Sequence, residues 1–337
     1  MAATLKDIAA LSGVSIATAS RVLNGKSGIR ASTREKVIQT AKDLGYVPDL
    51  LAKSMKIRRT FTIGLVVADI TNSFYSETAK IIETKARENN YTVIVCNTNN
   101  QKSLLDSIID TLKQKKVDGY IFASVELRNR SVQNLLQQGI PCIMYHRRLQ
   151  DCRGHFIGCD NYKSTSLAFM HLYELGHRNV GFISGPRTFS TGMERLDAYI
   201  KISKEMHLEV FPHYIKEGGY ERTKTARCVK ELVSLPQPPT AIIAANDLMA
   251  LQVLDTLSQI GYKVPEDFSV VGMDDISISS HSCIQLTTVD LKAKEGALLV
   301  IGNLLNLLER IQDNSKPIKI VLEPELKVRS TTSTPKK

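Results

Sequence analysis

The segment at residues 15–24, SIATASRVLN, carries side chains of the types that read double-stranded DNA. An arginine can donate two hydrogen bonds to a guanine edge, small apolar side chains can contact thymine methyl groups, and hydroxyls can reach phosphates. Arg21 would supply the first kind of contact, and Ile16 and Ala17 the second. The candidate DNA-binding residues of this segment are Ser15, Ile16, Ala17, Thr18, Ser20, Arg21 and Asn24.

A helix-turn-helix pattern surrounds this segment and would position it. Thr4 and Asp7 have the spacing of a capping box, Gly13 would end the first helix, and Ser15 would cap the second. The apolar faces expected to pack together are Leu5, Ile8, Ala9 and Leu11 on the first helix and Ala19, Val22 and Leu23 on the second. These faces leave the candidate DNA-binding residues on the outside of the second helix.

Positive charge is concentrated in the same part of the chain. The formal net charge of the 337 residues is +10, and residues 1–60 contain 11 Lys or Arg against 4 Asp or Glu. A further capping box, Ser32 with Glu35, predicts a third helix that ends at Gly45. A basic block with apolar periodicity, ahead of a near-neutral body, favours nucleic acid as the partner of that block.

From residue 61 onward, strand-length apolar runs alternate with helix-length patterns, which predicts parallel sheets with crossover helices. The series restarts near Asn161, so we expect two Rossmann-like lobes. Ligands of such open sheets bind beyond the carboxyl ends of the strands. The polar residues expected at those ends are residues 69–75, Asn97, His146, Arg147, Asp160, Asn246, Asp247 and Asp274.

A polyhydroxylated ligand also needs a flat apolar surface, which Phe74, Tyr75 and Tyr220 would supply. Asp247 precedes a helix pattern, so it suits a helix cap as well as a ligand contact.

Other patterns limit the class of protein. The sequence has no P-loop, no H-E-x-x-H and no G-x-S-x-G, so we expect no enzyme. The six cysteines form no C-x-x-C and no zinc-finger spacing, which favours a reducing cytoplasm and no metal site. The first residues do not resemble a signal peptide, and the apolar run at 296–308 is too short to span a bilayer. We therefore expect a cytoplasmic protein without a membrane partner.

Six ordered blocks of the sequence resemble the LacI/GalR (lactose repressor / galactose repressor) family of transcriptional regulators. The blocks are TLKDIAALSGVSIATASRVLNG, TREKVIQTAKDLGYVPD, ELGHRNVGFISGP, PTAIIAANDLMALQVLDTL, VPEDFSVVGMDD and LTTVD. The resemblance covers essentially the whole chain. It implies a homodimeric regulator, usually a repressor, whose two helix-turn-helix domains read the halves of a pseudo-palindromic double-stranded DNA operator. It implies no cofactor, but a small-molecule effector (a sugar, phosphosugar or related metabolite) in the cleft between the two lobes.

The family resemblance also implies an α/β fold with a fixed domain order. An all-α helix-turn-helix domain would occupy residues 1–48 and a hinge helix with linker residues 49–60. An effector-binding and dimerisation core, similar to periplasmic binding proteins, would follow at 61–330, with a tail at 331–337. The first lobe of this core would comprise residues 61–160 and 292–318, and the second 161–291 and 319–330. Helix 292–310 would return to the first lobe and strand 319–329 to the second.

In the hinge, Met55 stands where the family normally has a leucine that wedges between the central base pairs, and Ala52 would share its face. Ala19 is a second departure, at a position where the family usually has valine. Because the tail has no apolar heptad repeat, we expect a dimer and no tetramer.

The effector contacts implied by the resemblance are Phe74, Arg147, Asp160, Arg195, Tyr220, Asn246 and Asp274. We add His146, which stands where many sugar-binding relatives have an aspartate. His146, Arg147 and Arg148 together would form a cationic rim and favour an anionic effector such as a phosphosugar. The alternative is that His146 and Arg148 are ordinary surface residues.

Two other functions remain open at this stage. A periplasmic sugar-binding protein would share the two lobes, but it would carry a signal peptide and lack residues 1–58. A regulator of the same family whose co-effector is a phosphorylated carrier protein would share the whole sequence pattern.

Overall fold

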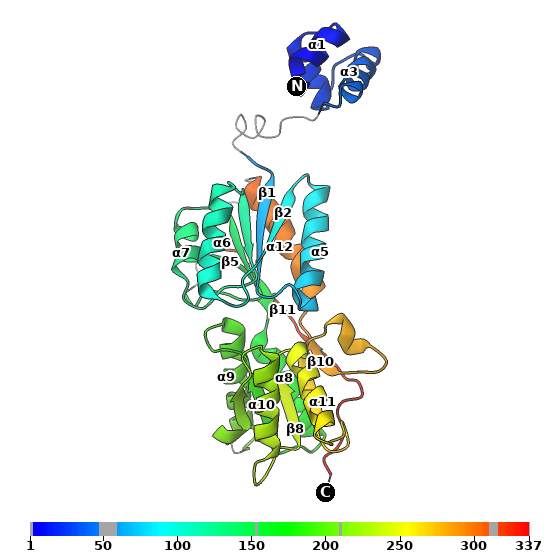
Figure 1. The fold of residues 1–337 in the computed structure, drawn as a ribbon. Helices are drawn as coiled ribbons and strands as arrows, with labels where there is room; N and C mark the ends of the chain where they lie inside the picture. The colour runs from blue at the N-terminus through cyan, green and yellow to red at the C-terminus, as the bar shows by residue number, and fades with distance from the viewer. Residues whose placement is uncertain (1–2, 47–58, 152–153, 209–210, 310–315, 337) are drawn as a thin grey trace. The chain divides into compact units, whose positions relative to one another are not determined.

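A computed structural model of the protein describes residues 3–46, 59–151, 154–208, 211–309 and 316–336. The chain divides into two compact units, Met1–Thr60 and Phe61–Lys337 (Figure 1). The expected hinge residues Ala52 and Met55 lie outside the described residues.

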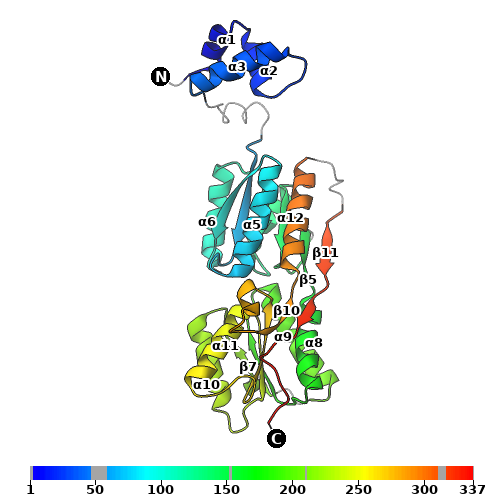
Figure 2. The same ribbon diagram turned by 90° about the vertical axis from the view of Figure 1, so that its right-hand side faces the viewer.

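The first unit contains three helices around a small apolar core. They are α1 (Leu5–Ser12), α2 (Ile16–Leu23) and α3 (Ala31–Asp43), all visible in Figure 2. The core consists of Ile8, Ala9, Ala19, Val22, Val37 and Ala41. Thr4 forms the expected capping box with Asp7, and Gly13 ends α1 with a left-handed φ of 69°, a conformation that glycine adopts without steric cost.

Two details of this unit differ from the sequence prediction. Leu11 is 62% exposed, because the inner face of α1 continues from Ile8 to Ser12, one full turn further on. The capping box between Ser32 and Glu35 does not form, because α3 already begins at Ala31 and Ser32 therefore lies inside the helix.

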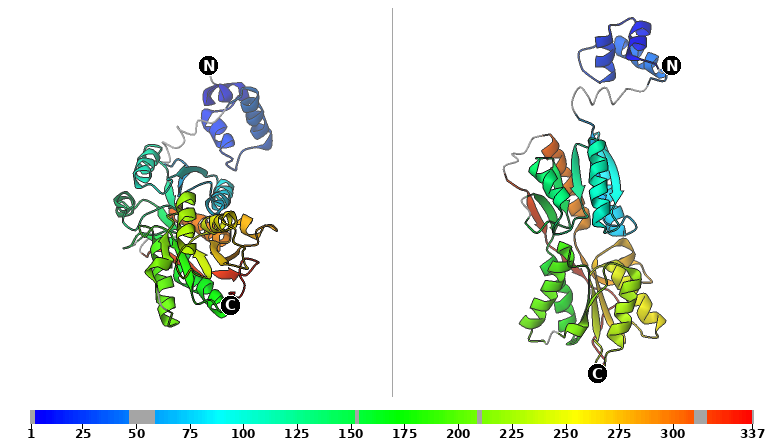
Figure 3. Two further views of the ribbon diagram at one scale, coloured as in Figure 1. Left: turned by 60° about the horizontal axis from the view of Figure 1, so that its bottom comes forward. Right: turned by 60° about the vertical axis from the view of Figure 1, so that its left-hand side comes forward.

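The second unit contains two six-stranded sheets, each covered by helices on both faces (Figure 3). The strands of the first sheet, in spatial order, are β11 (Lys319–Leu322), β5 (His155–Cys159), β4 (Cys142–Tyr145), β3 (Gly119–Phe122), β1 (Thr62–Val67) and β2 (Thr92–Asn97). Its helices are α5 (Ser73–Glu88), α6 (Lys102–Gln114), α7 (Arg130–Gln137) and α12 (Ala293–Leu308). Helix α12 packs beside α5 (Figure 2), so this C-terminal helix lies in the first lobe.

The second sheet repeats this arrangement. Its strands, in spatial order, are β12 (Glu325–Lys327), β10 (Thr287–Asp290), β9 (Ser269–Asp274), β8 (Ala241–Ala244), β6 (Val180–Ser184) and β7 (Ile215–Glu217). Its helices are α8 (Asn161–Glu174), α9 (Ser190–Glu205), α10 (Arg222–Val233) and α11 (Asp247–Gln259), with short 3-10 turns η1 (Pro212–Tyr214) and η2 (Ser277–Ser280).

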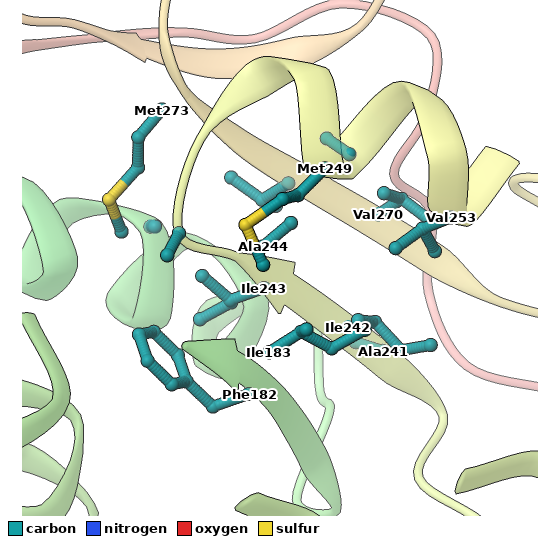
Figure 4. Close-up of a cluster of buried hydrophobic side chains, with 14 of the residues drawn as sticks. Phe182, Ile183, Ala241, Ile242, Ile243, Ala244, Met249, Val253, Val270 and Met273 are labelled. Atoms are coloured by element: carbon teal, nitrogen blue, oxygen red, sulfur yellow. The ribbon is translucent and has the colours of Figure 1, made fainter. Parts of the chain in front are cut away.

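The apolar runs become strands because both faces of each sheet are covered. In β1, Ile63 and Leu65 face the core under α5 and α12, whereas Val66 faces the core under α6 and α7. In the second lobe, Phe182, Ile243 and Met249 are fully or almost fully buried (Figure 4). Phe182 stacks on Tyr199 of α9, whereas Met249 belongs to α11. Burying such a side chain stabilises the fold by about 1.5–3 kcal/mol. Because both faces of each sheet are packed in this way, the positions of the strand ends are fixed.

The expected single strand at 319–329 is wrong in one respect, because it forms two strands in different sheets. β11 pairs in parallel with β5 of the first lobe, and β12 pairs antiparallel with β10 of the second. Pro324, which has no backbone N–H, lies between them and separates the two ladders.

The segment that we expected to be a tail, 331–337, is packed against the second lobe over its described residues. The Val270 amide donates to the Thr331 carbonyl at 2.8 Å, and Thr331 is buried. The Ser333 carbonyl lies 2.9 Å from Nε2 of His177. Among the described residues, no helix is both long and apolar enough to cross a membrane.

Candidate DNA-reading face and effector pocket

The outer face of α2 presents the residues that the sequence predicts to contact DNA. Ser15, Ile16, Ala17, Arg21 and Asn24 are exposed, and Thr18 and Ser20 are half-buried. Ser15 also caps α2, since its hydroxyl accepts a hydrogen bond from the Thr18 amide at 3.1 Å. The position of α2 is therefore fixed by its N-terminal cap and by buried Ala19 and Val22, while the opposite face of the helix remains exposed to solvent.

Arg21 is not fully extended from this face. Its Nη2 donates to the Ser27 carbonyl at 3.3 Å, a long and exposed hydrogen bond within the loop after α2. Such a bond is easily exchanged for a base edge, because an exposed hydrogen bond of this length contributes little stability.

An open cavity lies between the two lobes, where the carboxyl ends of both sheets face each other. Seven of the eight predicted effector residues line it: Phe74, His146, Arg147, Arg195, Tyr220, Asn246 and Asp274. The other lining residues are Asp69, Asn72, Tyr75, Asn100, Thr191 and Leu248. The mixture of aromatic and convergent polar groups is typical of a small-molecule site.

Asp160 does not line the cavity. Its carboxylate accepts the Lys163 amide at 2.9 Å and caps α8. Asp247 does not line the cavity either. It is not the N-cap of α11, because Asn246 has that role. The buried carboxylate of Asp247 accepts hydrogen bonds from the Ile276 amide at 3.0 Å, the Ser279 hydroxyl at 2.7 Å and the Thr288 hydroxyl.

The aromatic side of the cavity is built by close packing. The Phe74 ring lies 4.6 Å from the His146 ring, centre to centre. The Tyr220 ring lies against Gly185, where a Cβ atom would come within 2.2 Å of Tyr220 Cζ. Glycine is therefore required at position 185 for Tyr220 to reach its place, and the Tyr220 hydroxyl is then 3.1 Å from the Thr191 hydroxyl.

Two buried arginines line the cavity. Arg195 donates through Nε to Asn161 Oδ1 at 2.9 Å and through Nη1 to the Ala245 carbonyl. Its Nη2 has no hydrogen-bond acceptor among the described residues and lies 4.0 Å from Asp274 Oδ1. Arg147 donates through Nη1 to Asn100 Oδ1 at 2.7 Å and leaves its buried Nε without a described partner.

The electrostatics of the cavity correct the expected cationic rim. Burial, with Arg195 and Arg147 nearby, holds the pKa of His146 well below its usual value, so its ring is neutral at pH 7. Arg148 forms an ion pair with Glu194 at 2.7 Å and does not face the cavity. Of the three rim residues, Arg147 alone therefore presents a positive charge to a ligand.

Burial also raises the pKa of Asp274 well above its usual value, because Arg195 is too distant for a hydrogen bond that would compensate the lost hydration. The backbone at this strand end is strained, with φ of 123° at Asp274 and 51° at Asp275. The three hydrogen bonds to Asp247 and an ion pair of 2.6 Å between Asp275 and Arg329 hold it in place.

Several lining residues were not predicted individually. Asp69 and Asn72 belong to the strand end at 69–75 that the sequence indicated as a whole, whereas Tyr75 was expected as part of the apolar surface. Thr191 and Leu248 lie in the first turns of α9 and α11, so the first turn of each helix that follows a strand end is the signal for them. Within the described residues, no group of three His, Cys, Asp or Glu is placed to hold a metal ion.

A helix-turn-helix unit joined to a two-lobed core with a ligand cavity defines a DNA-binding protein that responds to a small molecule. Residues 4–49 match the family described as "Bacterial regulatory proteins, lacI family", and residues 169–332 match "Periplasmic binding protein-like domain".

Known repressors resemble the whole chain. It is 31% identical over 332 residues to the HTH-type transcriptional repressor PurR of Mannheimia succiniciproducens, covering 98% of both chains. It is 32% identical over 306 residues to the ribose operon repressor of Escherichia coli, covering 90% of this chain and 92% of the relative. A lac repressor dimer bound to operator and the anti-inducer ONPF has the same fold, with a TM-score of 0.87, 24% identity, and 99% and 100% of the two chains covered.

The chain belongs to the LacI family, and it is a DNA-binding transcriptional repressor with an effector-binding core. The resemblance and the fold class expected from the sequence are confirmed, and the match over residues 4–49 argues against a periplasmic sugar-binding protein.

Proposed function

We propose that this repressor binds a pseudo-palindromic operator as a homodimer and that a sugar or sugar derivative, such as a phosphosugar, controls its affinity from the cavity between the lobes. The observation that carries the proposal is the convergence of seven predicted effector residues on one cavity that both lobes line. A ligand that contacts both sides of such a cavity changes the relative free energies of the open and closed arrangements of the lobes.

The proposed contacts divide the chain into regions with separate tasks. Ser15, Ile16, Ala17, Thr18, Ser20, Arg21 and Asn24 of residues 1–48 would contact the operator, and Ala52 and Met55 of the hinge at 49–60 would contact its centre. Phe74, His146, Arg147, Arg195, Tyr220, Asn246 and Asp274 would contact the effector. Asp160 would act through the cap of α8, because it caps that helix and does not line the cavity.

Each chemical type in the cavity suits one part of a polyhydroxylated ring. The unpartnered Nη2 of Arg195 and Nε of Arg147 can donate to ring or hydroxyl oxygens. The Asp274 carboxyl oxygen without a partner can accept from a hydroxyl. The Phe74 and Tyr220 rings offer surfaces for the C–H face of the sugar.

The proposed dimer follows from the geometry of DNA. One α2 covers half of an operator, and two copies related by a two-fold axis match the symmetry of a pseudo-palindrome. Coupling between effector and operator would be about 1–3 kcal/mol and must act on both affinities equally. Because the proposed target is operator DNA, we place the protein in the cytoplasm, where it would act by binding and without catalysis.

Selection of bound fragments from a random DNA library by the purified full chain tests this proposal. We expect enrichment of one pseudo-palindromic site. Fluorescence anisotropy with that site then measures how sugars and sugar derivatives change operator affinity. Enrichment of single half-sites would refute the dimer, and a cavity ligand that leaves operator affinity unchanged would refute effector control.

A further inference from the structure

Three lysines are clustered at the end of α6, on the edge of the first sheet where the chain enters the core from the DNA-binding unit. Lys113 lies in the last turn of the helix, Lys115 and Lys116 follow it, and all three are exposed. The chain then returns to the sheet, where the Asp118 amide donates to the Thr62 carbonyl at 2.7 Å. The cluster therefore lies near the start of β1, the first strand after residue 60.

The charges of this cluster are not used to balance acidic side chains of the core. Within the part of the chain that the structure describes, Lys113 and Lys115 form no ion pair. The end of α5, on the same edge of the sheet, is different, because Lys85 pairs with Glu88 at 3.0 Å. The positive charge at the end of α6 is therefore available to a partner outside the core.

Position 116 is one at which glycine is usually found. Lys116 has a left-handed φ of 54°, and its amide donates to the Lys113 carbonyl at 2.9 Å. The same turn follows α1, α3, α7, α8 and α11, and in each of these a glycine has the left-handed conformation. A side chain strains the backbone in that conformation, whereas glycine adopts it without steric cost.

Termination of α6 therefore does not explain why lysine is present at this position. Compensation of the helix dipole needs a cation only in the last turn, and Lys113 supplies it. Lys115 and Lys116 add charge beyond the end of the helix, next to the chain that leads to the DNA-binding unit. An external polyanion accounts for all three lysines.

We propose that Lys113, Lys115 and Lys116 form a second DNA contact, in which their ammonium groups bind phosphates of the duplex that α2 reads. The proposal rests on the proposed operator binding and extends it from residues 1–60 to the core. An ammonium group binds phosphate as a point charge and reads no base, so the contact would add affinity without sequence preference. It would also accelerate association with DNA, because a positive surface attracts the duplex before it is bound.

The test measures the salt dependence of DNA binding by the full chain. Fluorescence anisotropy gives the affinity for a labelled duplex of mixed sequence, about 30 base pairs long, between about 50 and about 200 mM KCl. A second series uses the operator selected as described above. The logarithm of the affinity falls with the logarithm of the salt concentration, with a slope of about 0.9 for each phosphate contact.

Replacing all three lysines by glutamine should lower the magnitude of this slope by about 2–3 per protomer on both duplexes, since three contacts are lost. The ratio of operator affinity to mixed-sequence affinity should stay the same. Lys102→Gln is the matched control, because Lys102 is an exposed lysine at the other end of α6. It lies about 17 Å from Lys113 along the helix, farther than the Debye length of about 8 Å at physiological salt.

Lys116→Gly separates DNA binding from folding. Glycine removes the charge and suits the left-handed turn, so we expect a higher urea midpoint together with a smaller salt slope. Weaker DNA binding by a more stable protein cannot result from misfolding. This variant also keeps the test valid if the triple variant does not fold.

An unchanged salt slope in the triple variant and in Lys116→Gly would overturn the proposal. An equal fall of the slope in Lys102→Gln would also overturn it, because it would indicate a general effect of net charge. Enrichment of an operator together with an unchanged slope would refute the contact from the core alone. Failure to enrich any operator would refute the proposed function, and the mixed-sequence duplex would still test the three lysines.

Discussion

Replacing Asp247 by asparagine should make the stability of the core less dependent on pH. Asp247 is fully buried, and burial raises its pKa from an ordinary value of 3.8 to about 6 despite three hydrogen bonds. A carboxyl whose pKa is raised in the folded state binds more protons there than in the unfolded state between these two values. The contribution of Asp247 to stability is therefore largest in acid and is lost as the pH rises from about 4 to about 6.

The magnitude follows from the difference between the two pKa values. A pKa raised from 3.8 to about 6 corresponds to about 3 kcal/mol in total, of which about 2 kcal/mol falls between about pH 4.5 and about pH 7.5. The asparagine amide of Asp247→Asn cannot titrate, and it can still accept from Ile276, while the Ser279 and Thr288 hydroxyls can rotate. The free energy of unfolding of Asp247→Asn, relative to the natural protein, should rise by about 2 kcal/mol over this range.

The assay is urea unfolding of the full chain, followed by far-UV circular dichroism at several pH values. Asp255→Asn is the matched control, since Asp255 is an exposed carboxylate on the same helix. Its stability relative to the natural protein should not change in this way. The reasoning would be refuted if the free energy of unfolding of Asp247→Asn, relative to the natural protein, stayed constant or fell as the pH rose. Either result would show that the hydrogen bonds to Asp247 outweigh its burial.

Three further predictions concern the operator contact, the cavity wall and the C-terminal segment. Arg21→Ala should cost about 1–3 kcal/mol on the selected operator and relax preference at one base per half-site, and equal loss on all DNA would make Arg21 a phosphate contact. Gly185→Ala should displace the Tyr220 ring and weaken effector binding in calorimetry, whereas Gly302→Ala, which has open space around it, should not. Burial lowers the pKa of His177, so acidification below about pH 6.5 should reduce the urea midpoint, and a flatter profile in His177→Gln would confirm that His177 is responsible.

Local patterns were sufficient for most of the fold because each depends on near neighbours in the chain. The capping box at Thr4, the left-handed Gly13 and the buried strands are all consequences of a few adjacent residues. The crossings between the lobes required the family resemblance, since periodicity does not reveal which sheet a strand joins. Even then, the division of strand 319–329 was not predicted, because it depends on β5 and β10 each having an unpaired edge that β11 and β12 can join. Pro324 marks the point where the chain passes from the first sheet to the second.

The ligand cavity shows a different limit of the sequence. The rule that ligands bind at carboxyl ends of parallel strands selected residues from both lobes that line one cavity, although they are distant in the chain. The rule did not distinguish polar side chains that face the cavity from those that pair with other residues of the protein. Arg147 and Arg148 are adjacent, yet one faces the cavity without a carboxylate and the other pairs with Glu194 on α9.

The difference between those two arginines lies in the second lobe, which no local pattern around residue 147 describes. Glu194 also accepts from Asn161 at 2.7 Å, and Asn161 in turn accepts from Arg195 at 2.9 Å. The same carboxylate therefore neutralises Arg148 and helps to orient the arginine that faces Arg147 across the cavity. Because Glu194 pairs with Arg148 and not with Arg147, the charge balance of the cavity depends on a residue almost fifty positions away in the sequence.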